Sequence, residues 1–321
     1  RIGALRQRRK DRTGRAEHRV ARRVEAGVVP SHVRRGEALD VRPGSEDPLA
    51  QGVAAGKPRF STAVAFDVSP AASTIAPLSG AGRFAVPEGG LLDIRPDRGP
   101  MVKDQGFSGD GALGPTKARA AAKKGAVFAN FEGLSNVDNF NLFGFRVNPP
   151  DPVGDVGPRH YVEMVNLAVA VYDKQGNLLM GPTAIGDLWA GFAIEDCTDP
   201  SGDPIVLYDQ HVNRWVLSQF TTRGAPFYYN CVAISKTPDP TGEYYRYAFV
   251  TQADTIEGTY YFPDYPKYGV WTDSYLMTTR DFGDAGGYGI SVYALEKAKM
   301  ISGNPRARAV QFFLDEAVIP L

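Results

Sequence analysis

The chain has 321 residues, with 36 basic and 36 acidic side chains, a formal net charge of zero and 43% hydrophobic residues. This length accommodates one large domain or two ordinary ones. The charge balance excludes a bulk electrostatic attraction of the whole molecule to nucleic acid or to an anionic membrane.

The first 36 residues are strongly basic. Only Asp11, Glu17 and Glu25 oppose a dense cluster of arginine and lysine side chains in this segment. The segment has no aromatic residue on which a nucleic-acid base can stack. We therefore expect a disordered or weakly helical tail over residues 1–36, with a nucleic-acid-binding arm as the disfavoured alternative. No apolar core follows the basic residues, so a signal peptide is not visible.

Residues 37–130 are rich in Gly, Pro and Ala and show no clear periodicity. We interpret them as a linker or pro-like region. Short strands are predicted over Phe60–Val68 and Phe84–Ile94, and two helical turns over Lys117–Lys124. The aromatic stretch that follows leads into Pro149 and Pro150, which predict an entry loop because proline cannot donate to a strand ladder.

Residues 131–321 contain a repeat of about 50 to 60 residues in three copies, at roughly 151–195, 203–251 and 264–315. Each copy begins with an aspartate, reaches a polar turn, and then presents an aromatic residue that opens a second strand. The aspartates are Asp151, Asp203 and Asp264, and the aromatic residues are Tyr161, Trp215 and Tyr275.

A second hairpin follows the first in each copy, which gives four strands per repeat. This pattern predicts an all-β fold made of β-propeller blades, with an all-β sandwich of evenly spaced strands as the alternative. Three blades do not close a propeller, which typically needs about four to eight. We therefore expect the chain to be part of a longer protein.

Three stretches carry a family resemblance. They are NPPDPVGDVGPRHYVEMVN, GDPIVLYDQHVNRWVLSQF and DYPKYGVWTDSYLMTTRDFG. They resemble a family of secreted bacterial β-propeller proteins that are loosely described as sialidase-like. The resemblance extends over about Phe131–Leu314 and implies a propeller fold and a secreted or cell-surface location. It implies no catalytic residue, because the shared motifs are structural.

The two cysteines, Cys197 and Cys231, flank the central hairpin. In a secreted all-β protein, an isolated pair within one module predicts a disulfide. Closing a loop of about 35 residues would stabilise the fold by about 3 to 4 kcal/mol in the chain-entropy model. The alternative is two buried free thiols in a cytosolic protein.

The repeated aspartates are the main candidate site. The first strand of each propeller blade lines the central channel, so Asp151, Asp203 and Asp264 would lie near one axis and bind Ca²⁺ or a polar ligand. The alternative is that each caps its own turn through backbone N–H groups. Tyr265 and Trp271 are candidate ligand contacts near this channel. We expect the remaining aspartates at the first-hairpin turns, Asp155, Asp209 and Asp273, to face solvent.

Catalytic signatures are missing from the sequence. It contains no HExxH helix, no GxSxG elbow, no P-loop and no sialidase Asp-box. The sequence therefore favours an extracellular module for binding or surface display, with a glycan or a protein as ligand and no membrane span. The alternative is a sialidase-like glycoside hydrolase.

Overall fold

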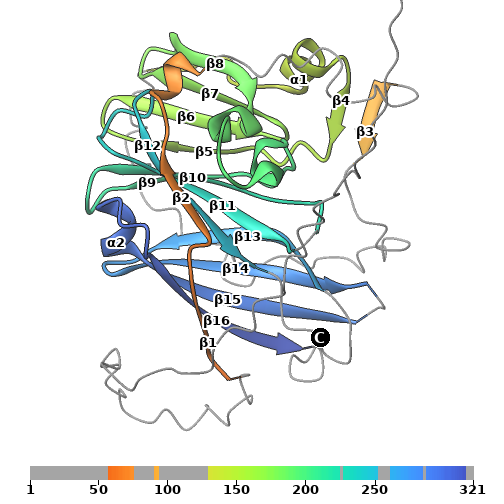
Figure 1. Cartoon of the computed structure of the whole chain (residues 1–321). Coiled ribbons are helices and arrows are strands. Elements are labelled where there is room, and N and C mark those ends of the chain that lie inside the picture. The colour runs from red at the N-terminus through yellow and green to blue at the C-terminus, as the bar shows by residue number, and fades with distance from the viewer. Residues whose placement is uncertain are drawn as a thin grey trace, which may run out of the picture. The chain divides into compact units, whose positions relative to one another are not determined.

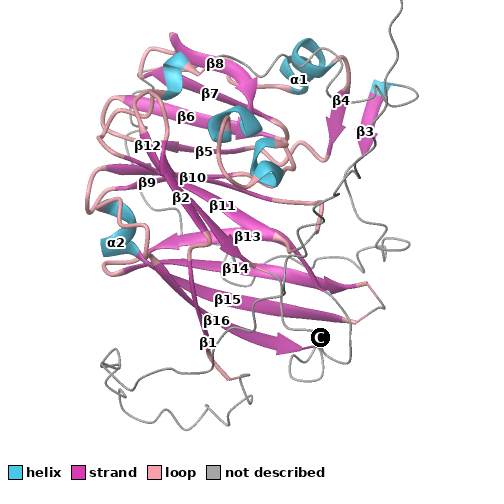
Figure 2. Ribbon diagram, in the orientation of Figure 1, coloured by secondary structure: helices cyan, strands magenta, loops and turns pink. Residues whose placement is uncertain are grey.

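The computed structural model describes residues 57–75, 90–93, 129–224, 227–251, 261–284 and 287–315. The described residues form an all-β structure with two five-stranded sheets, one four-stranded sheet and one two-stranded pair (Figures 1 and 2). The basic tail predicted over 1–36, the helix predicted over Lys117–Lys124 and most of the linker predicted over 37–130 lie outside the described residues.

Each of the three predicted repeats folds into an antiparallel meander of four consecutive strands. The first sheet contains β5 (Val153–Val156), β6 (His160–Val165), β7 (Ala168–Asp173) and β8 (Leu178–Ala184). The second sheet contains β9 (Ile205–Asp209), β10 (Arg214–Phe220), β11 (Tyr229–Ser235) and β12 (Tyr244–Val250). The third sheet contains β13 (Tyr261–Val270), β14 (Ser274–Gly283), β15 (Tyr288–Glu296) and β16 (Arg308–Asp315).

Burial follows the position of each sheet. Strands β10 and β11 of the second sheet are buried along nearly their whole length, because apolar cores cover both faces of this sheet. Strands β14 and β15 of the third sheet bury every second residue, as a sheet does when one face packs against a core. Within the described residues, none of the sheets closes on itself. No helix in this part of the chain has the length and apolar character needed to cross a membrane.

Two apolar cores lie between the three sheets. The first packs Val162 of the first sheet with Trp215 and Leu217 of the second sheet. The second packs Tyr247, on the opposite face of the second sheet, with Tyr275 of the third sheet. The repeat aromatics Trp215 and Tyr275 are both fully buried. Fully burying a large apolar side chain contributes about 1.5–3 kcal/mol, so these residues join one repeat to the next.

Residues 57–75, which we call the edge strap, add an outer strand to two of the sheets. Strand β1 (Arg59–Thr62) pairs with β16 in the third sheet, and β2 (Ala65–Val68) pairs with β12 in the second sheet. The short 3₁₀ helix η1 (Ala72–Thr74) then contacts β8 of the first sheet. In Figure 1 the strap is the orange segment that crosses the sheet edges.

The strand predicted over Phe60–Val68 is therefore two strands in different sheets. The chain changes sheets at Ala63 and Val64. Ala63 N donates to Ala307 O, directly before β16 of the third sheet, at 2.9 Å, and Val64 N donates to Ala248 O of β12 in the second sheet at 2.9 Å. Because each backbone N–H finds a partner, the crossing leaves no unpaired donor at this point.

Residues 129–148 cover the face of the first sheet that is turned away from the second sheet. The stretch contains the helix α1 (Asn136–Phe143) and the strand β4 (Arg146–Asn148), which pairs in parallel with β3 (Leu91–Asp93) and was not predicted. The entry loop predicted at Pro149 and Pro150 follows it and leads into β5. The helix starts with a capping box, in which Ser135 Oγ accepts from Val137 N at 3.2 Å and Asp138 accepts from Ser135 N at 2.7 Å.

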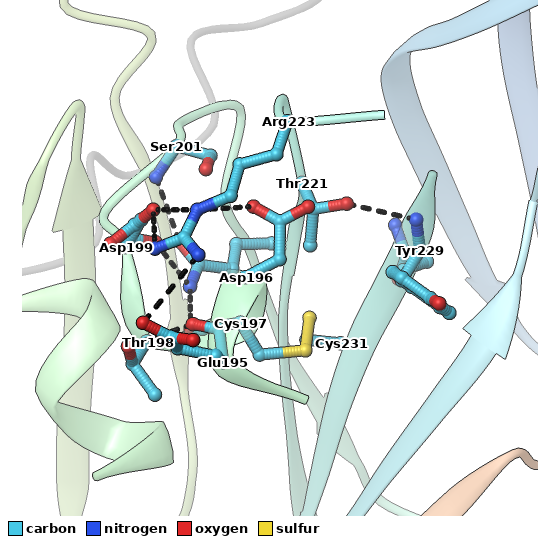
Figure 3. The surroundings of a disulfide bond; sticks show 12 residues. Glu195, Asp196, Cys197, Thr198, Asp199, Ser201, Thr221, Arg223, Tyr229 and Cys231 are labelled. Carbon is cyan, nitrogen blue, oxygen red and sulfur yellow. Dashed lines mark hydrogen bonds and ion pairs between the residues drawn. A yellow bond between two sulfur atoms is a disulfide. The ribbon is translucent and has the colours of Figure 1, made fainter. Parts of the chain in front are cut away.

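The predicted disulfide between Cys197 and Cys231 is confirmed (Figure 3). It joins the 3₁₀ helix η5 (Glu195–Thr198) to β11, and both cysteines are fully buried. Arg223 Nη2 lies 2.7 Å from Asp199 Oδ2 beside the disulfide. The covalent bond and the ion pair hold the loop before β9 against the second sheet. A further 3₁₀ helix, η4 (Ile185–Trp189), precedes this loop.

A buried ion pair joins the second and third sheets. Lys297, the first residue of α2 (Lys297–Ile301), lies with its Nζ 2.6 Å from Oδ2 of Asp209, and the two side chains are 2% and 0% exposed. The prediction that Asp209 faces solvent is therefore wrong. The hairpin turn that contains Asp209 belongs to the second repeat, whereas the residues that bury its side chain belong to the next one. Asp155 is half-buried and accepts from Tyr208 N at 2.7 Å, and Asp273 is exposed as expected.

Candidate functional site

The first strands of the three sheets lie next to one another, with β5 beside β9 and β9 beside β13. Each strand has one pre-proline residue with a left-handed backbone: Asp151 at φ 33°, Asp203 at φ 40° and Tyr265 at φ 52°. Steric contact with the proline ring pushes the preceding residue toward extended conformations. Such sparsely populated backbone states cost about 1–3 kcal/mol each and cluster at ligand sites, so their convergence marks this place as a candidate site.

These three residues lie at the same distance along the chain from the partners of the repeat aromatics. Each repeat aromatic pairs with the preceding strand: Tyr161 with Val156, Trp215 with Tyr208, and Tyr275 with Val270. Counting back equally from the three partners gives Asp151, Asp203 and Tyr265. Asp264 lies one position earlier, where the register shifts between Asp264 and Lys267. Because this shift adds one residue to β13, Asp264 still pairs with Arg280, five residues after Tyr275, and the equivalence of Asp264 with the other two aspartates stays a prediction.

The three aspartates nevertheless meet. The side chains of Asp151 and Asp264 each form a hydrogen bond with that of Asp203. Asp203 is 8% exposed and Asp264 is 3% exposed. Burial, the charge of Asp264 and the hydrogen bond with Asp151 raise the pKa of Asp203 to about 8. Asp203 therefore holds a proton at neutral pH, which lets it donate to a neighbouring carboxylate.

Asn166, at the end of the first hairpin, connects two of these aspartates. Its Nδ2 donates to Asp151 Oδ2 at 2.9 Å, and its Oδ1 accepts from Asp203 N at 2.8 Å. The side chain is fully buried. Asn166 thus fixes the loop of the first repeat to that of the second. Asn166 was not predicted as a site residue, and its only signal in the sequence is an amide residue placed directly after an apolar strand.

A pocket of about 310 Å³ opens beside the aspartates. Its walls come from the starts of β5 and β9 and from the bulged part of β13. The lining residues are Asp151, Pro152, Val153, Asp203, Pro204, Ile205, Val206, Leu207, Tyr265, Lys267 and Tyr268. All three repeats therefore contribute to one cavity, whose lining combines carboxyl groups with tyrosine rings and a lysine.

The two predicted aromatic contacts have different locations. Tyr265 is 41% exposed and lines the pocket, and Lys267 Nζ lies 3.3 Å from the centre of its ring. Trp271 is 62% exposed but does not line this pocket, because it follows β13 at the turn into β14. Of the two, only Tyr265 is placed to contact a ligand held beside the aspartates. Lys267 and Tyr268, which also line the pocket, were not predicted as site residues.

The Ca²⁺ site predicted at the carboxyl groups gains no support from the geometry. Within the described residues, no group of three or more His, Cys, Asp or Glu side chains is arranged to hold a metal ion. Asp151 and Asp264 each use part of their hydrogen-bonding capacity on the side chain of Asp203. We therefore base no proposal on the Ca²⁺ expected at Asp151, Asp203 and Asp264.

Substituting Asp203→Asn is expected to stabilise the protein at pH 9 by about 1–3 kcal/mol and to change its stability little at pH 4. The folded protein keeps the Asp203 proton up to about pH 8, whereas an unfolded chain loses it near pH 4. Wild-type stability therefore falls as the pH rises through this window. Asparagine cannot ionise, so this fall of stability with pH should disappear in the variant.

Urea denaturation at pH 4, 6.5 and 9 measures the free energy of unfolding, with substitution of the exposed Asp273 by asparagine as the control. An unchanged slope in Asp203→Asn would contradict the buried carboxyl cluster.

Comparisons with known proteins add no further assignment. No protein-family model, no curated protein and no solved structure matches this chain.

Proposed function

We propose that the three sheets are consecutive blades of a β-propeller and that the chain is an extracellular module that binds a glycan. Three features support the propeller. Each repeat is a four-stranded antiparallel meander, neighbouring meanders pack face to face, and their first strands are adjacent. The disulfide supports an extracellular compartment, because such bonds persist in oxidising surroundings. The sequence resemblance to secreted propeller proteins agrees with both.

The observation that carries the binding role is the pocket to which all three repeats contribute. Its carboxyl groups accept hydrogen bonds, and protonated Asp203 also donates one. Tyr265 offers an exposed aromatic edge, and Lys267 offers an ammonium donor. Convergent polar groups beside an aromatic surface suit a ligand with many hydroxyl groups. A concave pocket of about 310 Å³ favours a sugar residue over the flat surface of a protein partner.

The hydrolase alternative has one observation in its favour. Asp203 is neutral at pH 7 and lies beside other carboxyl groups, as in a general acid and its partner. However, the two carboxyl groups of a glycosidase flank the scissile bond and stand about 5–9.5 Å apart. Here Asp151 and Asp264 are in hydrogen-bonding contact with Asp203, which leaves no space for a glycosidic bond between the groups. The geometry therefore favours binding over glycosyl transfer.

A glycan array followed by isothermal titration calorimetry tests this role. We expect the protein to bind a subset of glycans, and Tyr265→Ala and Lys267→Ala each to weaken binding at least tenfold. A tenfold loss corresponds to about 1.4 kcal/mol, which is within the range for losing one aromatic or charged contact. Trp271→Ala is the matched control, since it removes a more exposed aromatic residue outside the pocket.

Two results would overturn the proposal. One is the absence of glycan binding by the wild-type protein. The other is binding that Tyr265→Ala and Lys267→Ala leave unchanged while Trp271→Ala abolishes it. Turnover of chromogenic glycosides that is lost in Asp203→Asn would favour the hydrolase instead.

A further inference from the structure

A second pocket, of about 400 Å³, lies on the first sheet. Val162 of β6 points into the core shared with the second sheet. Because side chains alternate along a strand, Tyr161 and Glu163 point to the opposite face, where they line this pocket. Phe131, from the segment before α1, and Lys174, from the turn after β7, complete its walls. The pocket is thus separate from the one beside Asp203.

Two glycines make room for the side chains that line this second pocket. A Cβ atom on Gly133 would overlap the carboxylate of Glu163, and a Cβ atom on Gly154 would lie 2.7 Å from the hydroxyl oxygen of Tyr161. Glu163 Oε2 in turn accepts from Leu134 N at 2.7 Å. The covering segment is therefore fixed directly onto the sheet. The two glycines therefore shape the pocket. A larger residue at either position would displace the Glu163 or Tyr161 side chain that forms its wall.

The lining combines an aromatic surface with polar groups of both signs. Phe131 packs against Tyr161 edge to face, with ring centroids 6.0 Å apart, and Tyr161 stacks on Tyr172 at 6.2 Å. The half-buried Glu163 accepts hydrogen bonds from Leu134 N and from the Tyr161 hydroxyl, and burial raises its pKa above the ordinary value. Asp173 contributes a second carboxylate to the lining. Lys174 places an ammonium donor on the same pocket.

This chemistry selects among ligand classes. A phosphate would need several cations, but Lys174 is the single cationic residue among those that line the pocket. A quaternary ammonium would need aromatic faces without a nearby cation, and the positive charge of Lys174 would repel such a ligand. A neutral sugar ring fits both constraints, because its C–H face packs on aromatic rings and its hydroxyl groups pair with a carboxylate and an ammonium. The volume is within the range of about 300–1,000 Å³ for small-ligand pockets.

We propose that the pocket lined by Phe131, Tyr161, Glu163 and Lys174 is a second, independent binding site for a neutral hexopyranose. This site goes beyond the pocket beside Asp203, because it is built by the first repeat and its covering segment alone.

Isothermal titration calorimetry with glucose, galactose, mannose, N-acetylglucosamine, lactose and cellobiose tests the proposal on the full chain. We expect at least one of these sugars to bind, and Lys174→Ala to weaken its binding at least tenfold. Val156→Trp should abolish binding, because Val156 is 53% exposed at the pocket and the indole would fill it. Leu178→Trp is the matched control, since Leu178 is a 49% exposed residue of the same sheet outside the lining.

Failure of this second site is distinguishable from failure of the first. Tyr265→Ala should leave this binding unchanged, since Tyr265 lines the other pocket. The proposal is overturned if none of the six sugars binds the wild-type protein. It is equally overturned if Val156→Trp, with a wild-type melting temperature, binds the sugar as well as Leu178→Trp does.

Discussion

Replacing Lys297 by methionine should lower the free energy of unfolding by about 3–5 kcal/mol, although methionine has a similar length and is more apolar. Lys297 Nζ lies 2.6 Å from Asp209 Oδ2 and donates to Trp271 O at 2.8 Å. Tyr275 OH donates to the same Asp209 oxygen at 2.9 Å. Removing the lysine leaves the fully buried Asp209 without its cation, and breaking a buried pair from one side costs about 3–5 kcal/mol.

The same interaction predicts how the double variant behaves. Asp209→Asn should also destabilise, because it leaves the ammonium of Lys297 buried without a counter-ion. The variant with both changes should lose less than the sum of the single losses, since no charge then remains buried. Urea denaturation gives all three values. Lys299→Met is the matched control, because Lys299 is 31% exposed in its pair with Glu296 and such pairs contribute about 0–1 kcal/mol. Equal losses for Lys297→Met and Lys299→Met would contradict a buried pair.

Asp209 also shows where reasoning from the sequence ends. Its turn position and its hairpin partners were predictable, because both depend on neighbouring residues. Its burial depends on Lys297 and Tyr275 from the next repeat, and no local pattern indicates that contact. The disulfide between Cys197 and Cys231 was easier to predict, because only two cysteines exist and so only one intramolecular pairing is possible.

The candidate site was predicted in outline and missed in detail. The repeat indicated that the starts of the first strands would converge, and Asp151, Asp203 and Asp264 do meet. Spacing alone did not show the bulge between Asp264 and Lys267, which adds one residue to β13. Because of this extra residue, Tyr265 shares the X-Pro step of Asp151 and Asp203, whereas Asp264 keeps the pairing position opposite Arg280. Asn166 was missed because its role depends on two separate loops.

No local sequence pattern predicts which strands the edge strap pairs with. Strand β2 was predictable as a short strand, but its partner β12 is far away in the sequence, and several exposed edges compete for any such strand. The partner is selected by specific contacts. Asp67 lies directly opposite Arg246 in the register, and Arg246 Nε and Nη2 lie 2.7 Å and 2.6 Å from the two carboxylate oxygens. Such a two-point contact adds both free energy and directional specificity.

Asp67→Ala should therefore lower the free energy of unfolding by about 2–4 kcal/mol and free the edge of β12. Arg246 is 2% exposed, and its Nη1 donates to Leu188 O at 2.9 Å and to Ala190 O at 3.1 Å, so it cannot easily turn to solvent. Without Asp67 its charge is buried and unpaired, which is costly. We place the loss below that of Lys297→Met, because the Asp67 side chain is 34% exposed and water screens it in part.

Two measurements separate a local from a global effect. Urea denaturation gives the stability, and hydrogen exchange at the β2–β12 ladder shows whether the strap detaches first. Val64 N and Ser69 N donate to carbonyls of β12 at 2.9 Å, and we expect exchange at these two amides to accelerate in Asp67→Ala more than exchange within β10 and β11. A detached strap would expose a sheet edge, so aggregation should begin at a lower temperature. Glu243→Gln is the matched control, since Glu243 is 51% exposed in its pair with Lys236. If Asp67→Ala is as stable as Glu243→Gln and its ladder exchanges at the wild-type rate, the edge strap is held by its backbone hydrogen bonds alone.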